Sequence, residues 1–139
     1  MTELLDFVVQ HWLLVSATLL VVVAIIVLEL NSFQRALPSL SPQAAVLLLN
    51  HDEAQLLDLR SPILFNEAHI AGAHNFPIEN LATLLPKCRL NRKNTLILIT
   101  ASGIIPKNDF KIFQENGFTK IATLAGGINA WREANFPLV

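Results

Sequence analysis

Few side chains in this 139-residue sequence combine the right types and spacing to do chemistry. Asp58, Arg60 and His69 lie close together along the chain, with His74 shortly after them. Carboxylate, guanidinium and imidazole groups can hold anions or move protons. Cys88 is the one cysteine, which excludes an internal disulfide and any site built from several cysteines. Thiol chemistry would therefore need Cys88 or a thiol supplied by another protein.

Each of these groups also has a plainer interpretation. The pair His69 and His74 lacks further ligands at metal-site spacing, so we predict no metal site, and nothing in the sequence indicates a cofactor. Cys88 lies in the basic segment 87–93, where neighbouring cations could make a thiol reactive, but we favour an incidental thiol. The segment itself is interpreted as a solvated loop, with contact to anionic lipid headgroups as the minority alternative.

The elements that position these residues alternate between strands and helices. Ser41 and Pro42 predict a helix start, through an N-cap followed by proline in the first turn. Asn116-Gly117 predicts a helix stop, and Phe110 and Phe113 point to the core. Such alternation indicates an α/β domain, with a small parallel sheet covered by helices on both faces. The strands are expected at 55–59, 96–100 and 120–124, and the helices at 42–49, 107–115 and 128–134.

Three separated motifs carry a family resemblance. Leu57-Asp-Leu-Arg60 is followed by Ala68-His-Ile-Ala-Gly-Ala-His-Asn-Phe-Pro77, and Leu124-Ala-Gly-Gly-Ile-Asn-Ala-Trp131 comes near the end. Together, and with the lead-in Glu115-Asn-Gly-Phe118, they resemble the signatures of the rhodanese superfamily from about Leu40 to Leu138. The resemblance implies a rhodanese-like fold and sulfur transfer through a cysteine. It also implies that Asp58, Arg60 and His69 tie the first loop to the sheet, and that Trp131 is a core residue.

The active loop departs from the family pattern. Relatives read Cys-x-x-Gly-x-Arg-Ser after the central strand, whereas this chain reads Thr100-Ala101-Ser102-Gly103-Ile104-Ile105-Pro106. A threonine hydroxyl cannot carry a persulfide, and residues 96–106 contain no His, Asp or Glu that could activate it. Ile105 replaces the anion-binding arginine and Pro106 removes a backbone donor. We therefore predict no catalytic residues in this loop.

The two isoleucines of the loop raise a second question. Ile104 and Ile105 follow a strand end, where α/β sheets normally bind ligands. They either fold inward and fill the vacated pocket, or form an apolar patch for a protein partner. Inward filling is the favoured expectation.

An apolar segment precedes the domain. From Phe7 to Leu28 the chain has no charged residue except His11, and about 20 apolar residues suffice to cross a bilayer as a helix. The acidic start of the chain and the lack of a cleavage site disfavour a signal peptide. We predict a transmembrane anchor within residues 1–30, a short linker at 31–39 and the rhodanese-like domain at 40–139. The whole chain looks like the membrane-anchored single-domain rhodanese proteins of bacteria.

The charge distribution gives a weak orientation and excludes one class of partner. Arg35 and the 87–93 segment follow the apolar run, and no Lys or Arg precedes it, which favours a cytoplasmic domain on the inner membrane. From residue 38 onward nine basic residues face eight acidic ones, so no nucleic-acid partner is expected.

Three functional hypotheses follow. The first is a catalytically inactive, membrane-tethered interaction domain with a membrane or membrane-associated protein partner. The second is residual or altered sulfurtransferase activity through Cys88 or a partner's cysteine. The third is a passive cap on a span that pairs with other membrane proteins, although the span lacks the Gly-x-x-x-Gly pattern.

Overall fold

The chain divides into two compact units, Met1–Ala36 and Leu37–Val139. The computed structural model describes residues 2–33 and 37–139, and the side chains of residues 6–28, 37–106 and 108–139. The predicted linker at 31–39 overlaps the last turn of one helix and a short strand at Ser39–Leu40. Its residues 34–36 lie outside the described residues.

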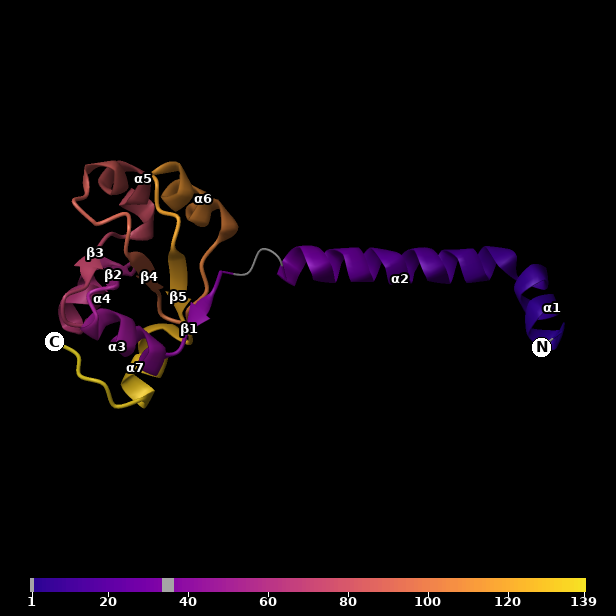
Figure 1. Cartoon of the computed structure of the whole chain (residues 1–139), viewed down its shortest axis with the longest axis horizontal. Helices are drawn as coiled ribbons and strands as arrows, with labels where there is room; N and C mark the ends of the chain where they lie inside the picture. Colours follow the sequence, from indigo (N-terminus) through magenta and orange to yellow (C-terminus); the bar gives the residue numbers. More distant parts are fainter. Residues whose placement is uncertain (1, 34–36) are drawn as a thin grey trace. The chain divides into compact units, whose positions relative to one another are not determined.

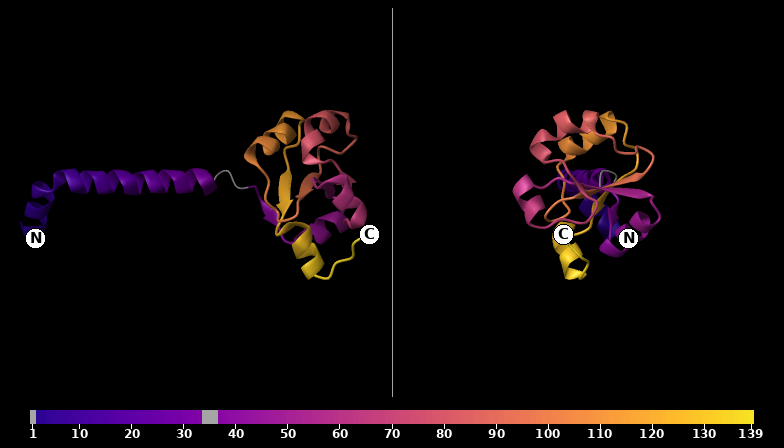
Figure 2. Two further views of the ribbon diagram at one scale, coloured as in Figure 1. Left: turned by 180° about the vertical axis from the view of Figure 1, so that it is seen from behind. Right: turned by 90° about the vertical axis from the view of Figure 1, so that its left-hand side faces the viewer.

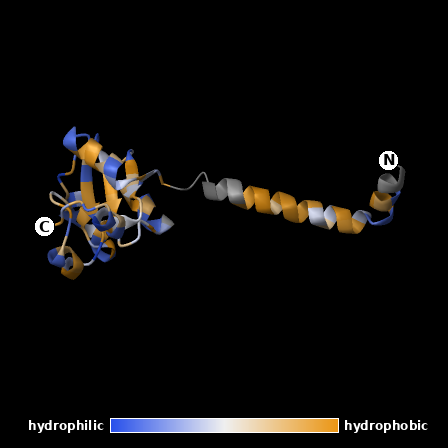
Figure 3. Ribbon diagram, turned by 90° about the horizontal axis from the view of Figure 1, so that it is seen from below, coloured by the Kyte–Doolittle hydropathy of each residue, from blue (hydrophilic) through white to orange (hydrophobic). Residues whose placement is uncertain are grey.

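The N-terminal unit contains two helices, α1 (Thr2–Gln10) and α2 (Trp12–Phe33), as Figure 1 shows. Most of the large apolar side chains described along α2 are exposed, for example Leu20 at 71% and Leu28 at 70%. The orange run along α2 in Figure 3 corresponds to this apolar surface. Within the part of the chain open to description, no helix is both long enough and apolar enough to cross a membrane.

The second unit is built on a sheet of five parallel strands in the order β1-β5-β4-β2-β3. The three inner strands match the predicted ones to within one residue at each end. Valine-, isoleucine- and leucine-rich strands of this kind suit a sheet that is buried on both faces. The strands are β1 (Ser39–Leu40), β2 (Ala54–Asp58), β3 (His74–Asn75), β4 (Thr95–Ile99) and β5 (Ile121–Leu124).

Helices cover both faces of the sheet, which confirms the predicted α/β fold of the domain (Figure 2). The hydroxyl of Ser41 accepts a hydrogen bond from the N–H of Ala44 at 3.2 Å and so caps α3, as predicted. Ser61 and Pro62 start α4 in the same way. The helices are α3 (Pro42–Asn50), α4 (Pro62–Glu67), η1 (Ile78–Asn80), α5 (Leu81–Leu84), η2 (Leu85–Lys87), α6 (Lys107–Glu115) and α7 (Gly127–Glu133).

Two apolar layers hold the domain together, one on each face of the sheet. On one face, Phe113 of α6 and Leu81 of α5 pack against Leu98 of β4, and all three are fully buried. On the other face, Ala45 of α3 and Trp131 of α7 pack with Ile97 and Ile99 of β4 and their neighbours. The indole N–H of Trp131 donates to the carbonyl of Pro137 at 3.1 Å, so this tryptophan is a core residue as predicted.

Candidate functional site

The loop after β4 lies against the Gly126-Gly127 turn that starts α7. The backbone N–H of Ile128 donates to the carbonyl of Thr100 at 3.0 Å. Gly103 and Gly127 have φ of +83° and +60°, in the left-handed region that favours glycine. A Cβ on Gly127 would collide with the carbonyl oxygens of Thr100 and Ala101. The two glycines therefore let two loops of the carboxyl edge, where the parallel strands end, approach at backbone distance.

Thr100 occupies the position expected for a nucleophile, and its hydroxyl is already engaged. Its Oγ1 accepts a hydrogen bond from the backbone N–H of Gly103 at 2.8 Å, and the residue is half-buried. In active relatives the backbone N–H groups of this loop are expected to converge on an anion. Here the threonine oxygen takes one of those donors. Sequence reasoning identified Thr100 but did not foresee this bond.

The two isoleucines of the loop do not behave alike. Ile104 is 77% exposed, so the expected inward filling is wrong for this residue. Ile105 is half-buried and packs against the apolar layer that contains Phe113 and Leu98. Ala101, Ser102 and Pro106 are also exposed.

Asp58 and Arg60 form a buried ion pair beside this loop. Arg60 Nη2 lies 2.7 Å from Asp58 Oδ2, and the side chains are 7% and 0% exposed. The Nε of Arg60 donates to both carboxylate oxygens, and Nη2 also donates to the carbonyl of Ala68 at 2.8 Å. Arg60 therefore links Asp58 at the end of β2 to the backbone of the first loop, which confirms the predicted tie between that loop and the sheet.

The rest of the first loop is held by further contacts of the predicted kind. His69 Nδ1 lies 2.8 Å from the carbonyl oxygen of Phe65, and the two rings stack with centroids 3.8 Å apart. The amide of Asn75 donates to the carbonyls of Asp58 and Arg60. His74 is exposed on β3. Among the described residues no cluster of three or more candidate ligands could hold a metal ion.

A polar pocket of about 250 Å³ opens beside the loop. Sequence reasoning missed its charged lining, although the helix expected after the Gly-Gly turn could have indicated that residues 129 and 132 face this edge. Glu67 of α4 and Arg132 of α7 supply charges of opposite sign. Its lining residues are Arg60, Leu64, Glu67, Ala68, Ala101, Ile128, Asn129 and Arg132.

Cys88 lies elsewhere in the domain. It follows η2, is half-buried, and packs against the same apolar layer as Ile105. The segment after it leads to the amino end of β4, whereas Thr100 follows the carboxyl end of that strand. Cys88 does not line the pocket beside the loop. The thiol is thus not brought to the position that the nucleophile has in the family pattern.

Comparison with known proteins gives the family. The model of the rhodanese-like domain matches residues 41–134. The chain is 34% identical to the thiosulfate sulfurtransferase GlpE of Shewanella oneidensis, over 69% of this chain and 93% of that protein. It is 28% identical to the uncharacterized protein YibN of Escherichia coli, over 100% of this chain and 98% of that protein. The chain belongs to the rhodanese-like family, and its domain has an α/β fold built on a parallel β-sheet.

Solved structures agree with this fold. A rhodanese-related protein from Thermoplasma volcanium is 26% identical, with a TM-score of 0.61, and the match covers 73% of this chain and 97% of that one. The rhodanese-like domain of the Alr3790 protein from Anabaena has a TM-score of 0.63 at 23% identity, over 73% of this chain and 78% of that one, which is a likeness of fold alone.

Proposed function

We propose that this chain is a catalytically inactive, membrane-tethered rhodanese-like domain that acts by binding another protein. The observation that carries the proposal is the Thr100 hydroxyl, which stands at the nucleophile position and accepts the N–H of Gly103 at 2.8 Å. A neutral hydroxyl in a hydrogen bond, with no described general base beside it, cannot accept a sulfane sulfur as a thiolate does. The loop is thereby closed to the family's chemistry.

The electrostatics of the site support inactivity as well. An anionic sulfur donor would need an available cation and free backbone donors. The Nε and Nη2 groups of Arg60 are engaged by Asp58 and Ala68, and position 105 carries isoleucine in place of arginine. Pro106 has no N–H to offer. Arg132 is the remaining cation of the pocket, and it shares that pocket with Glu67.

Exposed apolar side chains at the carboxyl edge support a binding role. Ile104 is 77% exposed beside Ala101, and Ile63 of α4 is 72% exposed. Burial of each such side chain by a partner would stabilise the complex by about 1.5–3 kcal/mol. An affinity pull-down from detergent-solubilised membranes tests this role, with Ile104→Ser as the variant. A partner that co-purifies with the native protein and not with the variant supports it, whereas equal recovery contradicts it.

The tether is proposed to be the apolar segment Phe7–Leu28. Its described apolar side chains are mostly exposed, and α2 continues to Phe33, past the last described side chain at Leu28. The similarity to YibN extends over this segment, which supports a role for the segment in the function of the protein. The full-length protein should stay in the membrane pellet after alkaline carbonate washing. Release into the supernatant would refute the tether.

The orientation is proposed to be cytoplasmic, on the inner membrane, because Lys and Arg follow the apolar segment and do not precede it. Cys88 reports on this directly. A membrane-impermeant maleimide should label it in opened vesicles and not on intact cells, with detergent-treated protein as the control for burial. Labelling on intact cells would reverse the orientation.

The alternative function is sulfur transfer through Cys88 or a partner's cysteine. Two observations favour it: Cys88 is a free thiol, and a relative at 34% identity is named a thiosulfate sulfurtransferase. After incubation with thiosulfate, intact-protein mass spectrometry separates the two functions. An unmodified protein fits the proposal, and a gain of one sulfur atom that disappears in Cys88→Ser fits the alternative.

A further inference from the structure

All strands of the sheet run in one direction, so the domain has two chemically distinct edges. The chain enters at Leu37 and Pro38, directly before β1, and the carbonyl of Pro38 accepts the N–H of Thr123 in β5 at 2.9 Å. Since β1 is parallel to its neighbours, the point of entry shares an edge with the segments that precede β2, β4 and β5. We call this side, formed by residues 37–38, 51–53, 87–94 and 115–120, the amino edge.

The loops of the amino edge are fastened to one another. Gln55 and Asn91 exchange hydrogen bonds, with the side-chain Nε2 donating to the Asn91 carbonyl and Oε1 accepting the Asn91 N–H. Asn94 donates to the carbonyl of Asp52 at 2.8 Å. Arg92 donates through Nε to the carbonyl of Asn116 at 2.9 Å. The basic segment is thus a fixed part of this edge.

Positive charge is concentrated here. Lys120 lies directly before β5, on the same groove as Leu37 and Pro38. The exposed cations of the edge outnumber its acids by five to three, whereas the pocket on the opposite edge is lined by both an acid, Glu67, and a base, Arg132. The cations are Lys87, Arg89, Arg92, Lys93 and Lys120, and the acids are Asp52, Glu53 and Glu115.

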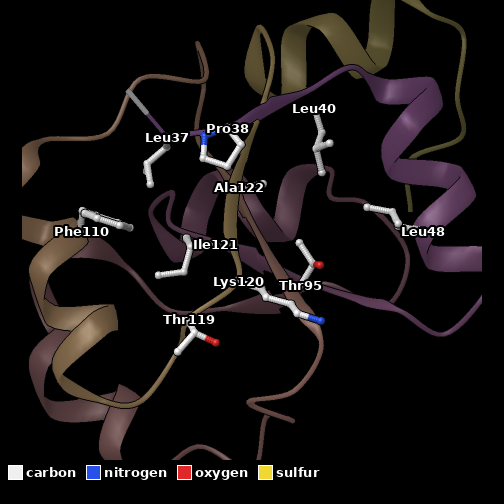
Figure 4. A pocket seen from close by; sticks show the side chains of 10 residues that line it. All are labelled: Leu37, Pro38, Leu40, Leu48, Thr95, Phe110, Thr119, Lys120, Ile121 and Ala122. Atoms are coloured by element: carbon white, nitrogen blue, oxygen red, sulfur yellow. The ribbon is translucent and has the colours of Figure 1, made fainter. Parts of the chain in front are cut away.

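An apolar groove of about 420 Å³ is lined in part by one of these cations, Lys120. Figure 4 shows Leu37, Pro38, Phe110 and Ile121 on its walls, with Lys120 beside them. A cation beside an apolar groove, with Pro38 exposed and Leu37 and Phe110 half-buried, suits the interfacial region of a bilayer, where charged groups meet phosphates and apolar groups reach below them.

The short chain segment between α2 and Leu37 limits how far the amino edge can lie from the proposed tether. Four peptide steps join Phe33, the last residue of α2, to Leu37, and they span at most about 14 Å. Anionic leaflets attract cations within roughly one Debye length, about 8–10 Å. This reach exceeds the Debye length, so the tether alone does not hold the domain within that range, but a domain attached at Leu37 brings its amino edge into the range more readily than its carboxyl edge.

We propose that the amino edge is a membrane-docking surface that binds the headgroups of anionic phospholipids. The inference rests on the proposed tether and extends it. Docking leaves the carboxyl edge, with Thr100 and Ile104, turned toward the solvent and accessible to a protein partner. The amino edge thus contacts the membrane, and the carboxyl edge remains available to a protein partner.

The test places an environment-sensitive dye at either edge of the full-length protein in vesicles. Thr119→Cys in a Cys88→Ser background labels the groove, and Asn129→Cys in the same background labels the opposite edge; both native residues are exposed. In vesicles that contain phosphatidylglycerol, the dye at position 119 should be shielded from aqueous iodide and the dye at 129 should not. High salt, or phosphatidylcholine alone, should remove the difference.

The charge variant Arg89→Gln/Lys93→Gln/Lys120→Gln tests the cause. At about fivefold per basic residue, its docking should weaken on the order of a hundredfold, while Arg132→Gln should dock as the native protein does. Equal shielding at both positions, or shielding that ignores lipid charge, overturns the inference. Carbonate washing of the same vesicles separates the failures. Retained protein without shielding refutes docking alone, and released protein refutes the tether and docking with it.

Discussion

The Thr100 hydroxyl oxygen and the backbone nitrogen of Gly103 are 2.8 Å apart, so the side chain at the nucleophile position caps its own loop. Replacing Thr100 by valine keeps the shape and leaves the Gly103 N–H without this acceptor. We expect the free energy of unfolding to fall by about 0.5–1.5 kcal/mol in urea titrations. Thr100→Ser, which keeps the hydroxyl, should lose less. Equal losses in both variants would mean that the bond does not stabilise the loop.

The buried pair of Asp58 and Arg60 should be the most sensitive polar contact of the domain. Arg60→Ala leaves a fully buried carboxylate without its partner, and we expect a loss of about 3–5 kcal/mol. The control is Lys111→Ala, which breaks an exposed pair with Glu115 at 3.9 Å and should cost less than about 0.5 kcal/mol. Similar losses in the two variants would show that Arg60 is not a structural residue.

Alanine substitutions of two glycines with positive φ, Gly127 and Gly72, form a matched pair of test variants. Gly127→Ala combines backbone strain with a collision against the carbonyls of Thr100 and Ala101, and we expect a loss of about 2–5 kcal/mol. Gly72→Ala has a φ of +80° and open space around its Cβ, so only strain of about 1–2 kcal/mol applies. Thermal melting of both variants measures the difference. A Gly127→Ala protein as stable as the Gly72→Ala protein would contradict the close packing of the two loops.

Serine substitutions of the two loop isoleucines should differ in their effect on stability. Ile105→Ser removes a half-buried side chain from the core and should lower the free energy of unfolding by about 1 kcal/mol. Ile104→Ser changes an exposed residue and should alter stability by less than about 0.5 kcal/mol. Chemical denaturation of the single variants checks this. A larger loss in Ile104→Ser would restore the view that Ile104 fills the vacated pocket.

Much of the fold could be predicted because its signals are local. Ser41 and Pro42 marked a helix start, and the inner strands showed their apolar runs. The strands β1 and β3 were missed because two residues carry no periodicity and form only where a neighbouring strand is present. Helix α4 was also missed, although Ser61 and Pro62 repeat the signal found at Ser41.

The sequence predicted which residues form the loop of the candidate site, but only part of how these residues are arranged in space. The family resemblance identified Thr100 at the nucleophile position and implied that Asp58, Arg60 and His69 tie the first loop to the sheet, but the ion pair between Asp58 and Arg60 was not predicted. Which of Ile104 and Ile105 reaches the core depends on the path of the loop over the Gly126-Gly127 turn, which is a tertiary property that the sequence pattern does not encode. The same is true of the pocket between Glu67 and Arg132, whose walls come from segments far apart in the chain.

The most direct test of inactivity is thiosulfate-to-cyanide sulfur transfer by the purified full-length protein. GlpE of Shewanella oneidensis serves as the positive control. The triple variant Thr100→Cys/Ile105→Arg/Pro106→Ser, which rebuilds the family loop, shows whether the scaffold can support the reaction. We predict no turnover above a buffer blank for the native protein and little for Thr100→Cys alone, because Ile105 and Pro106 still spoil the anion site. Robust turnover by the native protein that is lost in Cys88→Ser would contradict the account.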